Sequence, residues 1–347
     1  DPAPLLTTAY GMSQSMWIVT ARSPFATVLP NIVLLLVGLV VFVAIIVLIF
    51  VLSERTKEKT QNRLKYFVFL GPALLLLIIG LIYPAIRTLY LSFFDARSEN
   101  FIGLQNYIWA FTQPEILIVL RNTLIWTIVV PIASTTIGLA IAYLTDRMKY
   151  AGLVKSLIFM PMAISFVGAS IIWKFVYTYQ PDPNKADIGL LSAIFKAIGL
   201  TPPNWLLEAP LNTFLLIAVM VWIQTGFAMV VLSAAMKAVP DDIIEASMLD
   251  GAKGWARFTR ITIPMIWGSV IVVLTTITVT SLKVFDIIRT MTGGNFQTSV
   301  IANEMYQQSF RALNYGTGSA LAMILFLGVL PLIIFNVRQV RKEREVH

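Results

Sequence analysis

The chain has 347 residues, of which 57% are hydrophobic and only 13% are charged, and its mean hydropathy is +0.79. A soluble domain carries about 25% charged residues. Several apolar runs exceed the ~18 residues that can cross a bilayer, so the sequence predicts an all-α, polytopic transmembrane helical bundle. The net charge of +8 is expected to come from Lys and Arg in cytoplasmic loops, and not from a nucleic-acid site.

The composition also excludes most catalytic chemistry. The chain contains no Cys, and its one His is His347. Zinc sites built from Cys and His, thiolate chemistry and histidine acid–base catalysis are therefore not expected. The phosphate-binding pattern G-x-x-x-x-G-K-[ST] is also absent. We expect no catalytic residue, no metal site and no cofactor bound by this chain.

Residues 1–65 are predicted to form an N-terminal segment with one transmembrane helix. Residues 1–28 show no clear periodicity, whereas residues 29–52 are apolar and long enough to cross the membrane. Five basic residues follow in a linker at 53–65, and only Arg22 precedes the helix. The positive-inside rule places this linker in the cytoplasm and the N-terminus outside.

Residues 66–347 are predicted to form the main membrane domain. Six more spans are expected, at 66–90, 122–144, 156–178, 211–234, 263–288 and 317–337. With this assignment, sixteen of the 26 Lys and Arg residues fall in inward-facing segments. The sequence thus predicts seven spans, with the C-terminus and the loop at 240–264 in the cytoplasm.

The loop at 240–264 (PDDIIEASMLDGAKGWARFTRITIP) lies between two apolar runs. Pro240 suits the first turn of a helix, and Asp241, Asp242 and Glu245 place negative charge near its positive end. Gly251 can adopt the left-handed conformation that ends a helix. A second helix should follow in the membrane interface. Its apolar stripe is Ala252, Trp255, Phe258 and Ile261, and its basic residues off that stripe are Lys253, Arg257 and Arg260.

This loop resembles the EAA loop of ABC-importer permeases. The matching residues are Glu245, Ala246, Gly251, Ile261 and Pro264, and the departures are Ser247 and Ile263. The alternative is an ordinary cytoplasmic loop with a short helix.

Two further motifs are similar to carbohydrate permeases of this class, the maltose and α-glucoside type that depends on a binding protein. One is G-L-x-N-Y at 103–107. The other is Thr292-Gly293-Gly294, where Phe296 replaces the usual Pro. The resemblance covers residues 66 to about 340. It implies that the outward loops at 179–210, with one helix near 188–199, and at 289–316 face a soluble binding protein.

The resemblance implies a permease subunit of an ATP-driven carbohydrate importer, multi-pass in the bacterial inner membrane and working by alternating access. It would form half of the pathway with a second permease subunit. A dimeric ABC ATPase would bind ATP and Mg, and an extracytoplasmic sugar-binding protein would deliver the solute, expected to be a disaccharide such as an α-glucoside. The residues implied in coupling to the ATPase are Glu245, Ala246, Ser247, Asp250 and Gly251.

The resemblance also implies a substrate pocket on two helix faces. Its positions correspond to Met220, Ile223, Gln224 and Phe227 in one span and to Ile277, Thr280, Ser281 and Val284 in the next. Both sets have the i, i+3, i+4, i+7 spacing of one helix face. Aromatic, amide and hydroxyl groups suit a neutral sugar. The alternative is that Ser and Thr here bond their own helix backbone or allow close packing.

Other functions remain open at this point. An ABC importer for a polyol, glycerol phosphate or a sulfonated sugar would use the same loop. An ion-coupled secondary carrier usually buries carboxylates at mid-membrane, and none is found here. An intramembrane enzyme would need a catalytic constellation that the sequence lacks. Lys283 and Asp286 are predicted to lie three apart on one helix, where they could pair with each other or with the partner subunit. They are interpreted as structural, with a role in gating as the alternative.

Overall fold

The computed structural model describes residues 70–146, 148–181 and 189–346, together with scattered helical positions between 32 and 47. The predicted N-terminal segment, most of the first span and the basic linker lie outside the described residues. Within the described part no strand occurs, and the one β-type pairing is an isolated bridge between Phe94 and Phe101. The prediction of an all-α bundle is confirmed. The chain forms two compact units, Asp1–Ala85 and Ile86–His347.

The first described membrane helix is Leu70–Leu91. It contains a π-helical turn, η1 (Ile78–Ile82), directly before α4 (Tyr83–Leu91). Pro84 in α4 supplies no backbone N–H, and a locally widened turn is a common response to such a gap. The apolar side chains of this helix are exposed along its length, which suits a helix surrounded by lipid.

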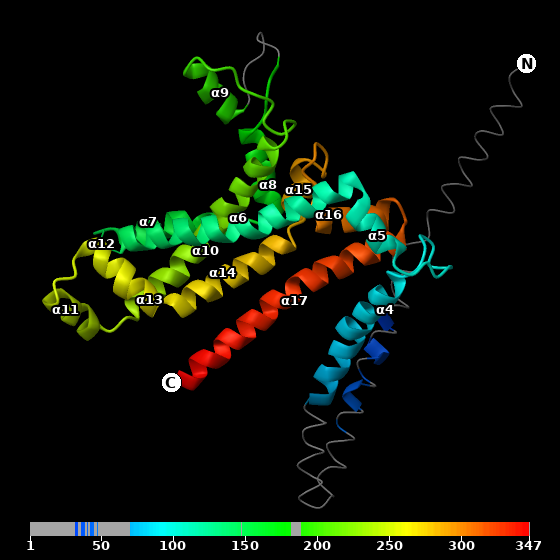
Figure 1. Ribbon diagram of the computed structural model, residues 1–347, viewed down its shortest axis with the longest axis horizontal. Helices are drawn as coiled ribbons and strands as arrows, with labels where there is room; N and C mark the ends of the chain where they lie inside the picture. Colours follow the sequence, from blue (N-terminus) through cyan, green and yellow to red (C-terminus); the bar gives the residue numbers. More distant parts are fainter. Residues whose placement is uncertain are drawn as a thin grey trace, which may run out of the picture. The chain divides into compact units, whose positions relative to one another are not determined.

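Three long helices cross the second unit. They are α6 (Pro114–Thr145), α10 (Leu211–Lys237) and α17 (Tyr315–Val346). They cover the predicted spans at 122–144, 211–234 and 317–337. Figure 1 shows α6 and α10 running side by side, with α14 (Trp267–Leu282) lying between α6 and α17.

Glycine allows the closest of these contacts. A Cβ added at Gly138 of α6 would lie 2.6 Å from the Cβ of Ala228 and 2.8 Å from the backbone nitrogen of Met229, both in α10. Only a residue without a side chain fits at that crossing. Around it lies the main core, which includes Trp126, Leu216 and Met220, each at most 1% exposed.

The predicted span at 156–178 is not one straight helix. It consists of α7 (Ala151–Phe159), η2 (Met160–Ala163) and α8 (Phe166–Val176), and the chain bends by 101° between η2 and α8. Pro161 disrupts the hydrogen-bond ladder, and the Ser165 hydroxyl accepts a hydrogen bond from the N–H of Gly168 at 3.1 Å. The bend is therefore a capped helix start, and not a simple kink.

The predicted span at 263–288 is also wrong in its boundaries. A helix made of α12 (Gly254–Arg257), η3 (Phe258–Thr262) and α13 (Ile263–Met265) meets α14 at a bend of 71°, next to Pro264. At its other end α14 stops at Leu282, and α15 (Asp286–Met291) begins a new helix. Lys283 and Asp286 thus do not share one helix, and they form no ion pair with each other.

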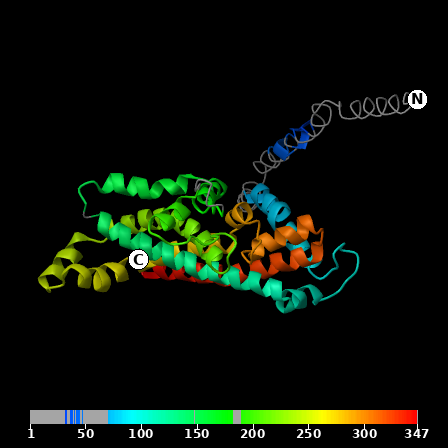
Figure 2. The same cartoon turned by 90° about the horizontal axis from the view of Figure 1, so that it is seen from above.

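Four described helices are long and apolar enough to span a membrane, and six spans result if each bent pair counts as one. The seventh predicted span, at 29–52, lies largely outside the described residues. The remaining helices are short; they are α5 (Gln105–Thr112), α9 (Leu190–Ala197), α11 (Asp241–Leu249), α16 (Ile301–Tyr306) and η4 (Gln307–Arg311). Helix α9 confirms the one predicted near 188–199. Figure 2 shows α11 at one end of the second unit.

The G-L-x-N-Y motif has a structural role in this fold. Gly103 takes φ +62° just before α5. The Asn106 amide donates to the carbonyls of Ser92 and Phe94, at 2.9 and 2.8 Å, and the Tyr107 hydroxyl is 2.7 Å from that of Ser92. The motif therefore holds the turn that follows α4.

Candidate functional site

The loop at 240–264 begins with the helix that the sequence predicts. Helix α11 runs from Asp241 to Leu249, with Pro240 at its N-cap and Asp241 and Asp242 in its first turn. Gly251 follows with φ +81°. The helix, its charge pattern and its glycine turn are confirmed.

Most side chains of α11 are exposed in the second unit. Glu245, Ala246 and Asp250 are exposed. Leu249 is 89% exposed and Met248 51%. Large apolar side chains at such exposure are typical of a surface that contacts another molecule. Ser247 is an exception among the predicted coupling residues, because it is buried and its hydroxyl donates to the carbonyl of Ile244 at 2.6 Å.

A polar cluster lies at the base of this loop and joins three helices. Asp146, which follows α6, forms an ion pair with Lys155 of α7 and lies 3.9 Å from the ammonium of Lys237 in α10. The Ser233 hydroxyl lies 3.0 and 3.1 Å from its two carboxylate oxygens. Sequence reasoning missed this cluster, because its members are far apart in the chain. The one available signal was an acidic residue, Asp146, in the otherwise basic loop at 145–155.

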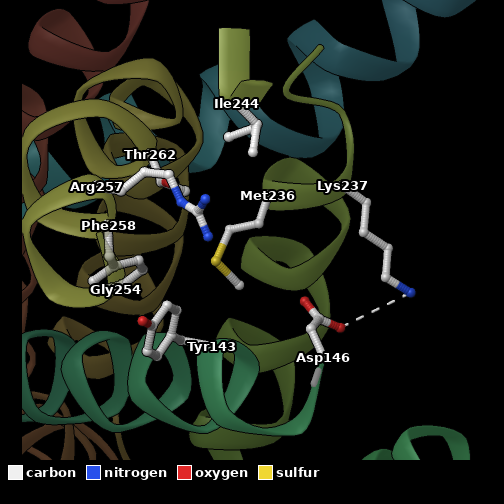
Figure 3. A pocket seen from close by; sticks show the side chains of 9 residues that line it. All are labelled: Tyr143, Asp146, Met236, Lys237, Ile244, Gly254, Arg257, Phe258 and Thr262. Atoms are coloured by element: carbon white, nitrogen blue, oxygen red, sulfur yellow. Dashed lines mark ion pairs between the residues drawn. The ribbon is translucent and has the colours of Figure 1, made fainter. Parts of the chain in front are cut away.

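A cavity of about 210 Å³ lies beside that cluster, between α11 and the ends of α6 and α10. Figure 3 shows the side chains around it, with the Arg257 guanidinium pointing into the space between Met236 and Ile244. Its lining residues are Tyr143, Asp146, Met236, Lys237, Ile244, Gly254, Arg257, Phe258 and Thr262.

A second cavity, of about 320 Å³, lies deeper in the second unit. It is lined by Met162, Ile164, Ser165, Phe166, Ile223, Gln224, Phe227, Thr276 and Thr280. Four of the eight predicted substrate positions, Ile223, Gln224, Phe227 and Thr280, are thus brought together here. They come from α10 and α14, and the elbow between η2 and α8 supplies the opposite wall.

Gln224 is the most informative residue in this cavity. The residue is 7% exposed, and no described residue forms a hydrogen bond with its amide. Because Gln224 lines the cavity, its amide is available to bond a molecule that enters there.

The other four predicted positions do not line this cavity. Met220, Ile277 and Val284 are packed in the main core, at 1%, 0% and 7% exposure. Ser281 is fully buried and donates to the carbonyl of Trp126 at 2.7 Å, so it ties α14 to α6. The i, i+3, i+4, i+7 spacing selects a broad face of each helix, and half of the eight predicted positions are used for packing against other helices.

The hydroxyls of α14 bond mainly to their own helix. Thr275, Thr276, Thr278 and Thr280 each donate to the carbonyl four residues earlier, at 2.7–2.9 Å. Thr276 and Thr280 still present oxygen lone pairs to the cavity, because a hydroxyl that donates one hydrogen bond can also accept.

Sequence reasoning missed the wall formed by Met162, Ile164, Ser165, Phe166 and Thr276. The available signal was Pro161 followed by Ser165 inside an apparently continuous apolar run, a pattern of helix end and helix start. Treating the run as a single span concealed it.

The predicted glycine turn at 292–294 is also present, with Gly293 and Gly294 at φ +69° and +88°. Phe296 and Gln297 follow with positive φ as well. The amide of Asn212 donates to the Phe296 carbonyl at 2.8 Å, and that of Asn122 donates to the Gln297 carbonyl at 2.6 Å. Side chains of α6 and α10 thus hold this loop in place.

In the described part of the chain, no three His, Cys, Asp or Glu side chains group in a way that could hold a metal ion.

Comparison with known proteins agrees with this architecture. Among curated relatives, an osmoprotective compounds uptake permease protein, GgtC, of Synechocystis sp. is 50% identical over 80% of this chain and 100% of its own. An alpha-glucoside transport system permease protein, AglF, of Rhizobium meliloti is 45% identical over 83% of this chain and 86% of its own. These relatives are transport permeases and not enzymes.

A solved structure shows the same fold. The structure of a bacterial alginate ABC transporter, in complex with an alginate pentasaccharide-bound periplasmic protein, contains a chain with a TM-score of 0.70 to this one and 20% identity. The match covers 82% of this chain and 96% of the other. Finally, residues 134–345 match the family model described as "binding-protein-dependent transport system inner membrane component". The chain is therefore a membrane-spanning permease subunit that belongs to the binding-protein-dependent transport system inner membrane component family.

Proposed function

We propose that this permease imports a neutral carbohydrate, with a disaccharide such as an α-glucoside as the expected solute. It would form half of the pathway with a second permease subunit. A dimeric ABC ATPase would hydrolyse ATP with Mg, and a sugar-binding protein would deliver the solute from outside. The α-glucoside permease at 45% identity supports this choice of solute.

The observation that carries the proposal is the amide of Gln224, which lines the deeper cavity and has no hydrogen-bond partner among the described residues. Phe166 and Phe227 line the same cavity and can stack on the apolar face of a sugar ring, while the amide bonds its hydroxyls. No charged side chain lines the cavity. A glycerol phosphate or a sulfonated sugar would need Arg or Lys there, so these rival solutes are disfavoured.

A second candidate solute is a small, neutral osmoprotective compound. The relative at 50% identity, whose name refers to the uptake of osmoprotective compounds, favours it. A cavity of about 320 Å³ is at the small end of ligand sites. Uptake competition between an α-glucoside and small polyols or their glycosides separates the two candidates.

Coupling to ATP would pass through α11. With the N-terminus outside and the C-terminus in the cytoplasm, α11 lies on the cytoplasmic side, where an ATPase can reach it. The exposed Glu245 would anchor α11 by an ion pair or hydrogen bond, and Gly251 would set the direction in which the chain leaves. Movement of the ATPase subunits would then move α11 and open the spans outward.

The test is to purify the tagged chain from its native membrane and to identify what accompanies it. An ATPase and a second permease are expected with the wild type. Glu245→Lys should lose the ATPase and sugar uptake while the subunit stays in the membrane. Glu115→Lys is the matched control, because Glu115 is an exposed carboxylate in the first turn of α6. Normal uptake by Glu245→Lys would contradict the proposal.

The energy source separates an ATP-driven importer from a secondary carrier. For the importer proposed here, uptake should stop when cellular ATP is depleted and should continue when ionophores dissipate the ion gradients while ATP is maintained. The opposite pattern would support an ion-coupled carrier.

A further inference from the structure

The cavity behind α11 contains more positive charge than its neighbours neutralise. Lys155 and Lys237 both interact with Asp146. Arg257 lines the cavity, yet no described residue forms an ion pair or hydrogen bond with its guanidinium. Asp146 is the one carboxylate among the lining residues, and it is already paired. The cavity therefore favours an anion.

One part of the lining is apolar. Met236, Ile244 and Phe258 line the cavity, and Phe258 belongs to an aromatic cluster. Its ring centroid lies 4.1 Å from that of Tyr143 and 5.3 Å from that of Trp255. A small free anion would prefer polar donors on all sides. An anion that carries apolar groups matches this surface better.

The outer surface of the same helix has the features of a membrane interface. Trp255 is 68% exposed, and Lys253 and Arg260 are also exposed. Exposed Trp beside Lys and Arg is typical of segments at the level of the lipid headgroups. Clusters of basic residues at this level attract anionic lipids.

We propose that this cavity binds the phosphate headgroup of an anionic phospholipid from the cytoplasmic leaflet, with Arg257 as its principal contact. Arg is well suited to this role because its planar guanidinium can bond two phosphate oxygens at once. The glycerol and first methylenes would lie on Met236, Ile244 and Phe258. The assignment to the cytoplasmic leaflet rests on the proposed function. The choice of a phosphate headgroup rests on the residues that line the cavity and does not depend on that function.

A bound headgroup would brace the coupling loop. Ile244 belongs to α11, Met236 to α10 and Arg257 to α12, and all three line one cavity. A lipid in that cavity would contact all three elements and fix their separation.

The test uses photocrosslinking in the complete importer in its own membrane. Ala256 is exposed, lies next to Arg257 in α12 and does not line the cavity, so Ala256→p-benzoylphenylalanine places a long reactive group on the same helix without filling the cavity. After irradiation the importer is purified and digested, and the adducts are identified by mass. We expect phospholipid adducts in which the anionic class is enriched about fivefold over its share of the membrane.

Three variants decide whether the site is specific. Arg257→Gln should reduce the enrichment to about onefold, whereas Arg257→Lys should keep most of it. Arg260→Gln is the matched control and should reduce the enrichment much less than Arg257→Gln does, because Arg260 lies on the same helical segment but does not line the cavity. If the Arg257→Gln variant fails to accumulate in the membrane, the lipid composition of the wild-type adducts and of the Arg257→Lys adducts still tests the proposal.

Several results would overturn the proposal. They are adducts with the bulk lipid composition, an equal loss of enrichment in Arg260→Gln, or adducts to an ATPase peptide or a soluble phosphorylated metabolite. Failure of the importer assignment gives a different result, because the chain would then purify without an ATPase but still yield enriched lipid adducts.

Discussion

Gln224 and Ser281 show how the same kind of polar residue in a membrane helix can serve opposite purposes. Ser281 is fully buried and bonded to the Trp126 carbonyl, so its polarity is used within the fold. Gln224 is nearly as buried but has no described partner, and it lines a cavity. Because the Gln224 amide faces a cavity and has no partner among the described residues, we expect a ligand to bond it there.

Replacing Gln224 should therefore weaken solute recognition without harming the fold. We expect Gln224→Ala to raise the sugar concentration for half-maximal uptake about threefold to tenfold, which corresponds to the loss of one hydrogen bond of ~1 kcal/mol. The control is Thr225→Val, because Thr225 bonds the Val221 carbonyl and does not line the cavity. Unchanged uptake by Gln224→Ala, or an equal defect in Thr225→Val, would contradict this assignment.

Gly251 offers a second test at the residue scale. Its φ of +81° is strained for a residue with a Cβ, although a Cβ there would meet no atom within 4 Å. Gly251→Ala should destabilise the left-handed conformation with which the chain leaves α11 by about 1–2 kcal/mol. It should therefore reduce ATP-driven uptake. Gly251→Asn should retain more activity, since Asn tolerates this conformation. Equal uptake by both variants would show that backbone conformation is not the cause.

At the scale of elements, the apolar runs predicted where helices lie but not where they bend. The run at 156–178 looks like one span by length and hydropathy, yet the Pro161 region and the Ser165 cap divide it at 101°. Local signals for the break were present in the sequence. Its angle depends on how α7 and α8 pack against α10 and α15, which no single run of residues encodes. The cavity wall at the elbow was unpredictable for the same reason.

Close packing of α6 and α10 gives a prediction about stability. Gly138→Ala would force the two helices apart, because the added Cβ would lie 2.6 Å from that of Ala228. Overpacking of this kind costs about 1–3 kcal/mol, so the purified importer should aggregate on heating at a temperature a few degrees lower.

Gly152→Ala in α7 is the control for this substitution. A Cβ there would meet no atom within 4 Å, so its heating curve should be unchanged or slightly shifted upward. A normal curve for Gly138→Ala would show that the helices can separate without loss.

At the scale of the whole molecule, the second unit presents apolar surface that a lone subunit in water would not keep exposed. Much of it belongs to membrane helices, but Leu249 lies on α11, in the polar loop between two apolar runs, and is 89% exposed. The sequence identified this loop through its glycine, its acidic helix start and its final proline. It could not show that Ser247 turns inward while Leu249 turns outward, because that depends on how α11 packs.

Leu249 should therefore contribute to assembly. Burying a Leu side chain is favourable by about 1.5–3 kcal/mol, so Leu249→Ser should weaken binding of the ATPase roughly tenfold to a hundredfold, as measured by titrating the ATPase onto immobilised permease. Leu200→Ser, at an exposed position in the loop at 179–210, is the control and should bind normally. Normal ATPase binding by Leu249→Ser would place the contact elsewhere on the loop.

The 101° elbow has a mechanical consequence for the transport cycle. The helical rod Ala151–Ala163 is about 20 Å long at 1.5 Å per residue. Near one end, Lys155 is tied to Asp146 and Ser233; at the other, Met162 and Ile164 line the deeper cavity. Lys155 lies about 12 Å from Ala163 at this rise, so rotating the rod by about 10° around Lys155 moves the elbow by about 2 Å. That displacement exceeds a carbon–carbon bond length, so a modest tilt beneath the coupling loop suffices to reshape the cavity in which we propose that the solute binds.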